Sequence, residues 1–225
     1  MAEKIKGSIS FFVWLVSYFF LFIFIKFFLS IHVRYEDECF QGIENPTIVV
    51  SNHKNSFDPW IIFTSVPFKV FLKLLPIRPF ATKKFHNKPL LDTLSSLGII
   101  SFIYYIYNVI TIPDTESFEE KTKPIINALN KKNSILIFPE GRITKDEDVG
   151  KFKKGVIYLQ ERTKAPILPC SIRFGNRGWF RRKAFVSFGK TFYTPKDLTE
   201  ENERDYYEAR EFLRKKIKIL YRKTC

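Results

Sequence analysis

Residues 51–60 read Ser-Asn-His-Lys-Asn-Ser-Phe-Asp-Pro-Trp, a polar block between two apolar segments. The preceding residues 47–50 are β-branched and mostly apolar, which is typical of a buried strand. Asp58 and Pro59 predict a helix start, because Asp can accept hydrogen bonds from the first free amides and Pro fits the first helical position. The block therefore predicts a strand, a loop and a helix. Only a folded loop could bring His53 and Asp58 together, since this spacing on one helix would point them apart.

The pair His53 and Asp58 has the residue types of a general base. A neutral imidazole can take a proton from a hydroxyl that attacks an electrophile. A carboxylate behind it fixes the tautomer and stabilises the imidazolium that forms. The sequence has no G-x-S-x-G nucleophile elbow. Taken alone, the pair leaves a second interpretation open, in which Asp58 only caps a helix and His53 is an ordinary loop histidine.

A second block, residues 134–144, reads Ser-Ile-Leu-Ile-Phe-Pro-Glu-Gly-Arg-Ile-Thr and again runs from a buried-type strand into a polar turn. With N-H-x4-D at Asn52, His53 and Asp58, the F-P-E-G-R-I block resembles the glycerolipid acyltransferase family. Its best known member type is 1-acyl-glycerol-3-phosphate acyltransferase. The Lys-Phe-Lys-Lys-Gly at 151–155 and the strand at 167–172 resemble its later blocks. The resemblance covers roughly residues 45–190.

The resemblance implies acyl transfer from acyl-CoA or acyl carrier protein to the free hydroxyl of 1-acyl-glycerol-3-phosphate, which gives phosphatidic acid. It assigns His53 as the base and Asp58 as the residue that orients it. The implied substrate-binding residues are Asn52, Lys83, Glu140, Gly141 and Arg142. No metal and no bound cofactor are implied, since the thioester is a co-substrate. The implied fold is α/β, a mixed central sheet flanked by helices, and the alternation of helical stretches with apolar strands supports it independently.

One family block is altered. Members usually carry an Arg, associated with the acceptor phosphate, shortly after a Gly-led apolar strand. Residues 97–105, which we expect to form that strand, contain no Arg. The F-P-E-G-R-I form, with Arg142 where many members have Thr, also resembles acyltransferases that act on lysophosphatidylethanolamine. Another lysophospholipid of that kind and glycerol-3-phosphate are therefore alternative acceptors. A non-catalytic, basic lipid-binding membrane protein and a nucleic-acid-binding protein are alternatives from other classes.

Charge and hydropathy indicate a membrane lipid partner. The net charge of +14 and the pI near 9.6 favour an anionic partner. No nucleic-acid motif is present, so we expect membrane phospholipids and not nucleic acid. Residues 8–25 are uncharged and apolar, at the length threshold of a membrane-spanning helix. We expect residues 1–33 to anchor residues 34–225, an acyltransferase domain, at the cytoplasmic face. The flanking charges do not decide between a span and a helix within one leaflet.

The remaining pattern predicts the elements around the two blocks. A helix over 60–75 should break at Pro67, a short strand should lie near 79–81, and a helix should follow at 88–97. Helices are also expected at 118–130, 151–162 and 199–223, and strands at 166–172 and 184–189, the latter closing the sheet. The three cysteines match no disulfide or metal pattern, which favours a reducing compartment with Cys170 in the core.

Overall fold

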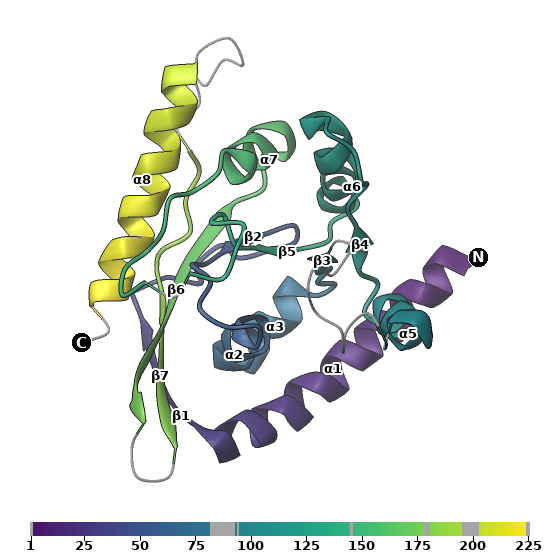
Figure 1. Cartoon of the computed structure of the whole chain (residues 1–225), viewed down its shortest axis with the longest axis horizontal. Coiled ribbons are helices and arrows are strands. Elements are labelled where there is room, and N and C mark those ends of the chain that lie inside the picture. Colours follow the sequence, from purple (N-terminus) through teal and green to yellow (C-terminus); the bar gives the residue numbers. More distant parts are fainter. Residues whose placement is uncertain are drawn as a thin grey trace.

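The computed structural model describes residues 2–81, 93, 95–144, 146–177, 181–194 and 203–223. Its helices are α1 (Ala2–Phe28), α2 (Asp58–Ser65), α3 (Phe68–Leu74), α5 (Ile99–Ile106), α6 (Phe118–Asn130), α7 (Gly155–Thr163) and α8 (Glu203–Arg222) (Figure 1). Its strands are β1 (Leu29–Tyr35), β2 (Ile48–Val50), β3 (Phe80–Ala81), β4 (Ile110–Thr111), β5 (Ile135–Ile137), β6 (Ile167–Arg177) and β7 (Arg182–Phe188). The predicted break at Pro67 is confirmed, since α2 and α3 flank it.

The central sheet is mixed, which confirms the predicted fold class. Its five strands lie in the order β1-β7-β6-β2-β5, with β6 and β7 antiparallel and the other neighbours parallel. Strand β2 lies between β6 and β5, with Ile48 opposite both Ile135 and Ile167. The strand expected to close the sheet, β7, is instead covered by β1 at the edge, because the chain after α1 enters the sheet.

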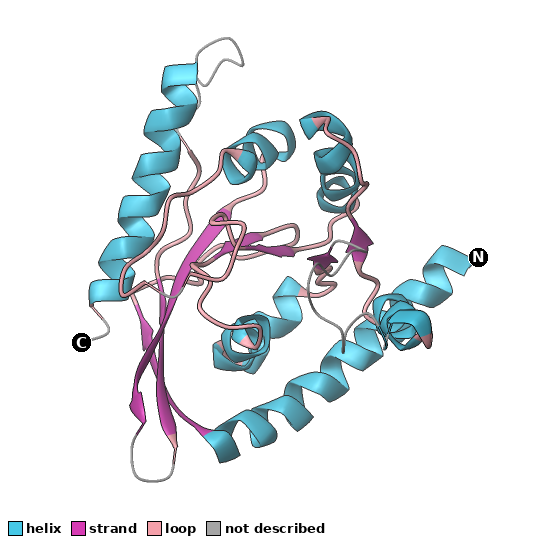
Figure 2. Cartoon of the chain, viewed as in Figure 1, coloured by secondary structure: helices cyan, strands magenta, loops and turns pink. Residues whose placement is uncertain are grey.

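Helices cover both faces of the sheet (Figures 1 and 2). Because successive side chains of a strand point to opposite faces, β2 contributes to two cores. Val49 packs in the cluster that includes residues of α1, α2 and α3. Ile48 and Val50 pack in the cluster that includes residues of α6, α7 and α8. All three residues are buried, so the strand that leads into the polar block is fixed from both sides.

The strand predicted over residues 97–105 is wrong, because Ile99–Ile106 forms helix α5. Gly98 precedes it in the left-handed region, with φ of +74°, a conformation that favours glycine. Helix α5 packs against α1, and the Ser17 and Tyr107 hydroxyls lie 2.6 Å apart beside this contact. A short apolar run fits a strand or a helix equally well, so only the partner α1 distinguishes them.

The apolar N-terminus ends differently from the prediction. Helix α1 stops at Phe28, and Leu29–Tyr35 pairs with β7 in the central sheet, so the division expected at residue 33 falls inside β1. Trp14, Tyr18 and Ile25 of α1 are buried in the core. The Tyr18 hydroxyl donates to the Val66 carbonyl at 2.9 Å. Helix α1 is therefore a packed part of the domain.

One further boundary differs from the prediction, and one expected helix cannot be compared. Helix α7 begins at Gly155 and not at Lys151, because residues 151–153 continue the loop that follows β5. Lys83 and most of the helix expected over 88–97 lie outside the described residues.

Candidate active site

The two polar blocks meet at one edge of the sheet. Strands β2 and β5 are parallel neighbours, so the residues that follow them leave the sheet on the same side. The Ser51 amide donates to the Ile137 carbonyl at 3.1 Å. The Thr144 amide donates to the His53 carbonyl at 2.8 Å. The backbone thus ties the loop of His53 to the loop that contains Glu140, Gly141 and Arg142.

His53 and Asp58 lie within hydrogen-bond distance, as the folded loop requires. Nδ1 of His53 is 2.9 Å from Oδ2 of Asp58, which is fully buried. The amides of Lys54 and Asn55 donate to the same oxygen at 2.5 and 2.8 Å. An ionised carboxylate only accepts, so Nδ1 carries the hydrogen and Nε2 keeps its lone pair.

Asp58 does not cap its helix as the sequence suggested. The residue before α2, Phe57, makes no side-chain cap, and the Asp58 carboxylate turns back to the amides of the preceding loop. The consequence is a rigid loop that presents His53. Its ring also stacks on Phe138, with centroids 4.0 Å apart and planes at 15°. The His53 side chain remains 18% exposed, so an incoming molecule can reach it.

Asn52 does not have the position of a substrate ligand, which corrects the expectation for this residue. It is fully buried. Its Nδ2 donates to the Ile172 carbonyl at 2.9 Å, and its Oδ1 accepts from the Ile172 amide at 2.9 Å. Its side chain therefore joins the end of β2 to β6 and provides hydrogen-bond partners for the buried amide and carbonyl of Ile172.

We expect Asn52→Ala to lower the free energy of unfolding by about 2–4 kcal/mol, because two buried backbone groups lose their partners. Chemical denaturation in detergent measures the change. Asn127→Ala is the control, since Asn127 is exposed on α6. A change below about 1 kcal/mol at position 52, within the range of a surface substitution, would contradict this role.

Glu140 is buried and holds its own loop together. One carboxylate oxygen accepts from the Thr144 hydroxyl, and the other accepts from the Gly150 amide at 3.3 Å. Gly141 has φ of +68°, and a Cβ there would lie 2.8 Å from Nζ of Lys153. Arg142 is exposed on this loop. Of the three residues, Arg142 is the one that can approach a ligand freely.

Three cations that the sequence did not single out fix the loop over residues 146–150. Nζ of Lys54 donates to the carbonyls of Asp146 and Asp148 at 2.6 and 2.7 Å, and burial lowers the pKa of its ammonium. From α8, Nε of Arg214 donates to the Gly150 carbonyl at 2.8 Å, and Lys218 pairs with Asp148. The sequence carried no signal for these contacts, because α8 is distant in the chain.

The described part of the chain contains no cluster of three His, Cys, Asp or Glu residues that could hold a metal ion. The residues that the two loops bring to one edge of the sheet are an oriented imidazole, a buried carboxylate and an exposed arginine. Such a set can remove a proton from a hydroxyl and attract an anionic group.

Comparison with known proteins gives a consistent result. A family model described as Acyltransferase matches residues 31–173. A chloroplastic 1-acyl-sn-glycerol-3-phosphate acyltransferase of Brassica napus is 25% identical over 155 residues, which is 64% of this chain and 39% of that protein. A probable 1-acyl-sn-glycerol-3-phosphate acyltransferase of Mycoplasma genitalium is 25% identical over 137 residues, which is 57% of this chain and 44% of that protein. The chain thus spans less than half the length of these two curated relatives. The crystal structure of the 1-acyl-sn-glycerophosphate acyltransferase of Thermotoga maritima shares the fold, with a TM-score of 0.56, 20% identity and coverage of 98% of this chain and 83% of that one.

Proposed function

The chain belongs to the acyltransferase family, and on this premise we propose that it acylates the free hydroxyl of 1-acyl-glycerol-3-phosphate to give phosphatidic acid. The acyl group comes from a thioester, either acyl-CoA or acyl carrier protein. The observation that supports this most is the 2.9 Å contact between His53 Nδ1 and the buried carboxylate of Asp58. A lipid-binding protein without catalytic activity does not need a histidine that is oriented by a buried carboxylate.

The proposed reaction needs one proton transfer in each direction. Nε2 of His53 takes the proton of the acceptor hydroxyl while its oxygen attacks the thioester carbonyl carbon. Asp58 stabilises the imidazolium that forms. The carbon–sulfur bond then breaks, and the imidazolium returns the proton to the departing thiolate. No covalent acyl-enzyme is required, because the thioester is already an activated acyl group.

The direct test is an assay of purified protein with labelled acyl donors and several lyso-acceptors. We expect mass spectrometry to detect phosphatidic acid from 1-acyl-glycerol-3-phosphate. A product only from lysophosphatidylethanolamine or glycerol-3-phosphate would transfer the proposal to that acceptor. No product from any pair would refute the enzymatic function.

Arg142 is the proposed holder of the acceptor phosphate. It is exposed on the loop that Glu140 and Lys54 fix beside His53, and a guanidinium can donate two bonds to a phosphate. We expect Arg142→Ala to raise KM for the phosphate-bearing acceptor by about tenfold or more, the effect of losing a hydrogen bond to a charged group. Lys131→Ala, at an exposed site after α6, is the control. An unchanged KM would place the phosphate elsewhere.

Membrane association is proposed through α1. It is the one described helix with the length and hydropathy of a span, over residues 7–28, and 22% of its apolar window is buried. One of its faces packs on the domain, and the other exposes Phe11, Phe12, Val16, Phe19, Phe20, Ile23, Phe24, Phe27 and Phe28. Since its buried residues spread along the helix, α1 runs beside the domain (Figure 1), which favours a helix lying within the cytoplasmic leaflet.

We expect the double variant Phe20→Glu, Phe27→Glu to move the protein from membranes to the soluble fraction, because burying charge in lipid is unfavourable. Flotation with liposomes measures this. Tyr193→Glu changes an equally exposed aromatic residue outside α1 and should float like the original protein. Full flotation of the double variant would show that other surfaces carry membrane binding.

A further inference from the structure

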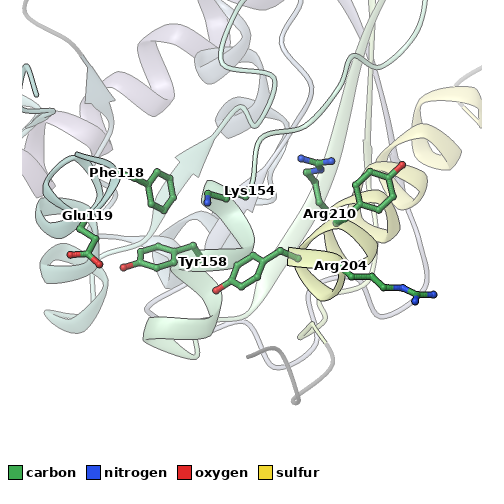
Figure 3. Close-up of a pocket in the computed structure, with 8 residues that line it drawn as sticks. Phe118, Glu119, Lys154, Tyr158, Arg204 and Arg210 are labelled. Atoms are coloured by element: carbon green, nitrogen blue, oxygen red, sulfur yellow. The ribbon is translucent and has the colours of Figure 1, made fainter. Parts of the chain in front are cut away.

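A groove of about 580 Å³ lies between α6, α7 and α8, apart from the site described above. Figure 3 shows the side chains that line it, which come from α6, from α7 and the residue before it, and from α8. They are Phe118, Glu119, Lys154, Tyr158, Arg204, Tyr206, Tyr207 and Arg210. The volume is that of a typical small-molecule site. The lining combines aromatic rings with cations, which suits an anionic ligand that carries a flat ring.

The cations of the groove lie against its rings. Nζ of Lys154 is 5.2 Å from the centre of the Phe118 ring, and the Arg210 guanidinium is 5.0 Å from that of Tyr207. Nε of Arg210 is buried and makes no hydrogen bond within the described structure, and the carboxylate of Glu211 lies 4.0 Å from it. Arg204 pairs with Glu208 at 3.1 Å. Lys154 and Arg210 are therefore the cations best placed to receive a phosphate.

The groove begins at the edge of the sheet where His53 lies. Helix α7 follows β5 through the loop over 138–154, so its first turn is at that edge, with Lys154 as the N-cap. The Lys153 amide donates to the Pro139 carbonyl at 2.8 Å, next to Phe138, on which His53 stacks. At the other end of α7, Glu161 accepts from the Tyr206 hydroxyl. The groove thus extends along α7 from the edge of the sheet at which His53 lies.

We propose that this groove binds the 3′-phosphoadenosine diphosphate end of a coenzyme A thioester, while the pantetheine arm extends to His53. The inference rests on the proposed acyl transfer and selects the donor. Adenine offers a flat ring to the aromatic lining of the groove, and the phosphates offer negative charge to Lys154 and Arg210, which already lie over the Phe118 and Tyr207 rings. A protein carrier would dock on the surface through complementary charge and would leave a hollow of this size unfilled.

The first test is direct binding of 3′,5′-adenosine diphosphate, which contains no acyl group and cannot react. Calorimetry on the full chain in detergent should detect saturable binding. Lys154→Gln and Arg210→Gln should each weaken it about tenfold or more, the effect of losing a hydrogen bond to a charged group. The control is Lys123→Gln, an exposed lysine of α6 that does not line the groove, and it should bind like the original protein. No saturable binding, or binding that neither variant weakens, overturns the groove assignment.

The second test separates this inference from the proposed function. With acyl-CoA, both groove variants should raise KM for the donor about tenfold while KM for the acceptor stays unchanged. Turnover with an acyl carrier protein thioester but not with acyl-CoA would support the proposed acyl transfer and contradict the assignment of the groove to coenzyme A. Nucleotide binding that depends on Lys154 and Arg210 without any acyl transfer would retain the groove as a nucleotide site and refute the enzymatic function.

Discussion

His53→Ala should lower kcat by about 10²–10⁴-fold, the range that a general base contributes. The geometry gives the reason. Nδ1 is held by Asp58 at 2.9 Å, so Nε2 is the ring atom that can take the hydroxyl proton, and alanine has no group to replace it. The ring also stacks on Phe138, which fixes its plane. The measurement is steady-state turnover of purified protein at saturating donor and acceptor.

His32→Ala is the matched control, because His32 is an exposed histidine of β1 that stacks on Phe185 outside the proposed site. It should keep full turnover. The His53→Ala protein should still float with liposomes, since α1 is unchanged. Retained turnover at position 53 would remove the base assignment and with it the mechanism.

Asp58→Asn should cause a comparable loss of kcat, although the side chain keeps its shape. The carboxylate is fully buried and accepts from His53 and from the amides of Lys54 and Asn55 through one oxygen. An amide cannot neutralise the imidazolium, and if its NH₂ faces the ring it favours the wrong tautomer. The loss should therefore appear in kcat and leave KM for either substrate nearly unchanged.

The same substitution weakens the loop, so stability must be followed in parallel. Circular dichroism and chemical denaturation establish the folded fraction on which kcat is based. Asp146→Asn is the control, because Asp146 is exposed in the neighbouring loop and only its backbone carbonyl is used, by Lys54. A folded Asp58→Asn protein with normal kcat would show that the carboxylate has only a structural role.

Local sequence determined a large part of this architecture. The apolar, mostly β-branched residues before Asn52 and before Phe138 form the neighbouring parallel strands β2 and β5, because both faces of the sheet bury them. Pro67 separates α2 from α3 as expected, since a proline interrupts the hydrogen bonds of a helix interior. Helix α6 begins at the residue expected, with Ser117 as its N-cap accepting from the Glu120 amide.

The sequence pattern predicted the wrong element where the local sequence fits a helix and a strand equally well and tertiary contacts determine which one forms. Residues 99–106 are apolar except for Ser101, and so short an apolar run fits a strand as well as a helix, so their packing against α1 decides for a helix. The end of the apolar N-terminus was misplaced for a related reason. Leu29 and Ile31 continue the apolar run of the helix before them, and pairing with β7 makes Leu29–Tyr35 a strand.

Strand propensity, turn residues and helix start signals act over a few neighbours, so the strand, loop and helix that present His53 and Asp58 follow from residues 47–60 alone. The roles of Asn52 between two strands and of Glu140 in its own loop arise from packing of the folded chain, as do the contacts of Lys54, Arg214 and Lys218 with the loop beside the site. These contacts form between segments that are distant in the chain. No local pattern encodes which donor a buried acceptor will meet once the sheet and α8 have come together.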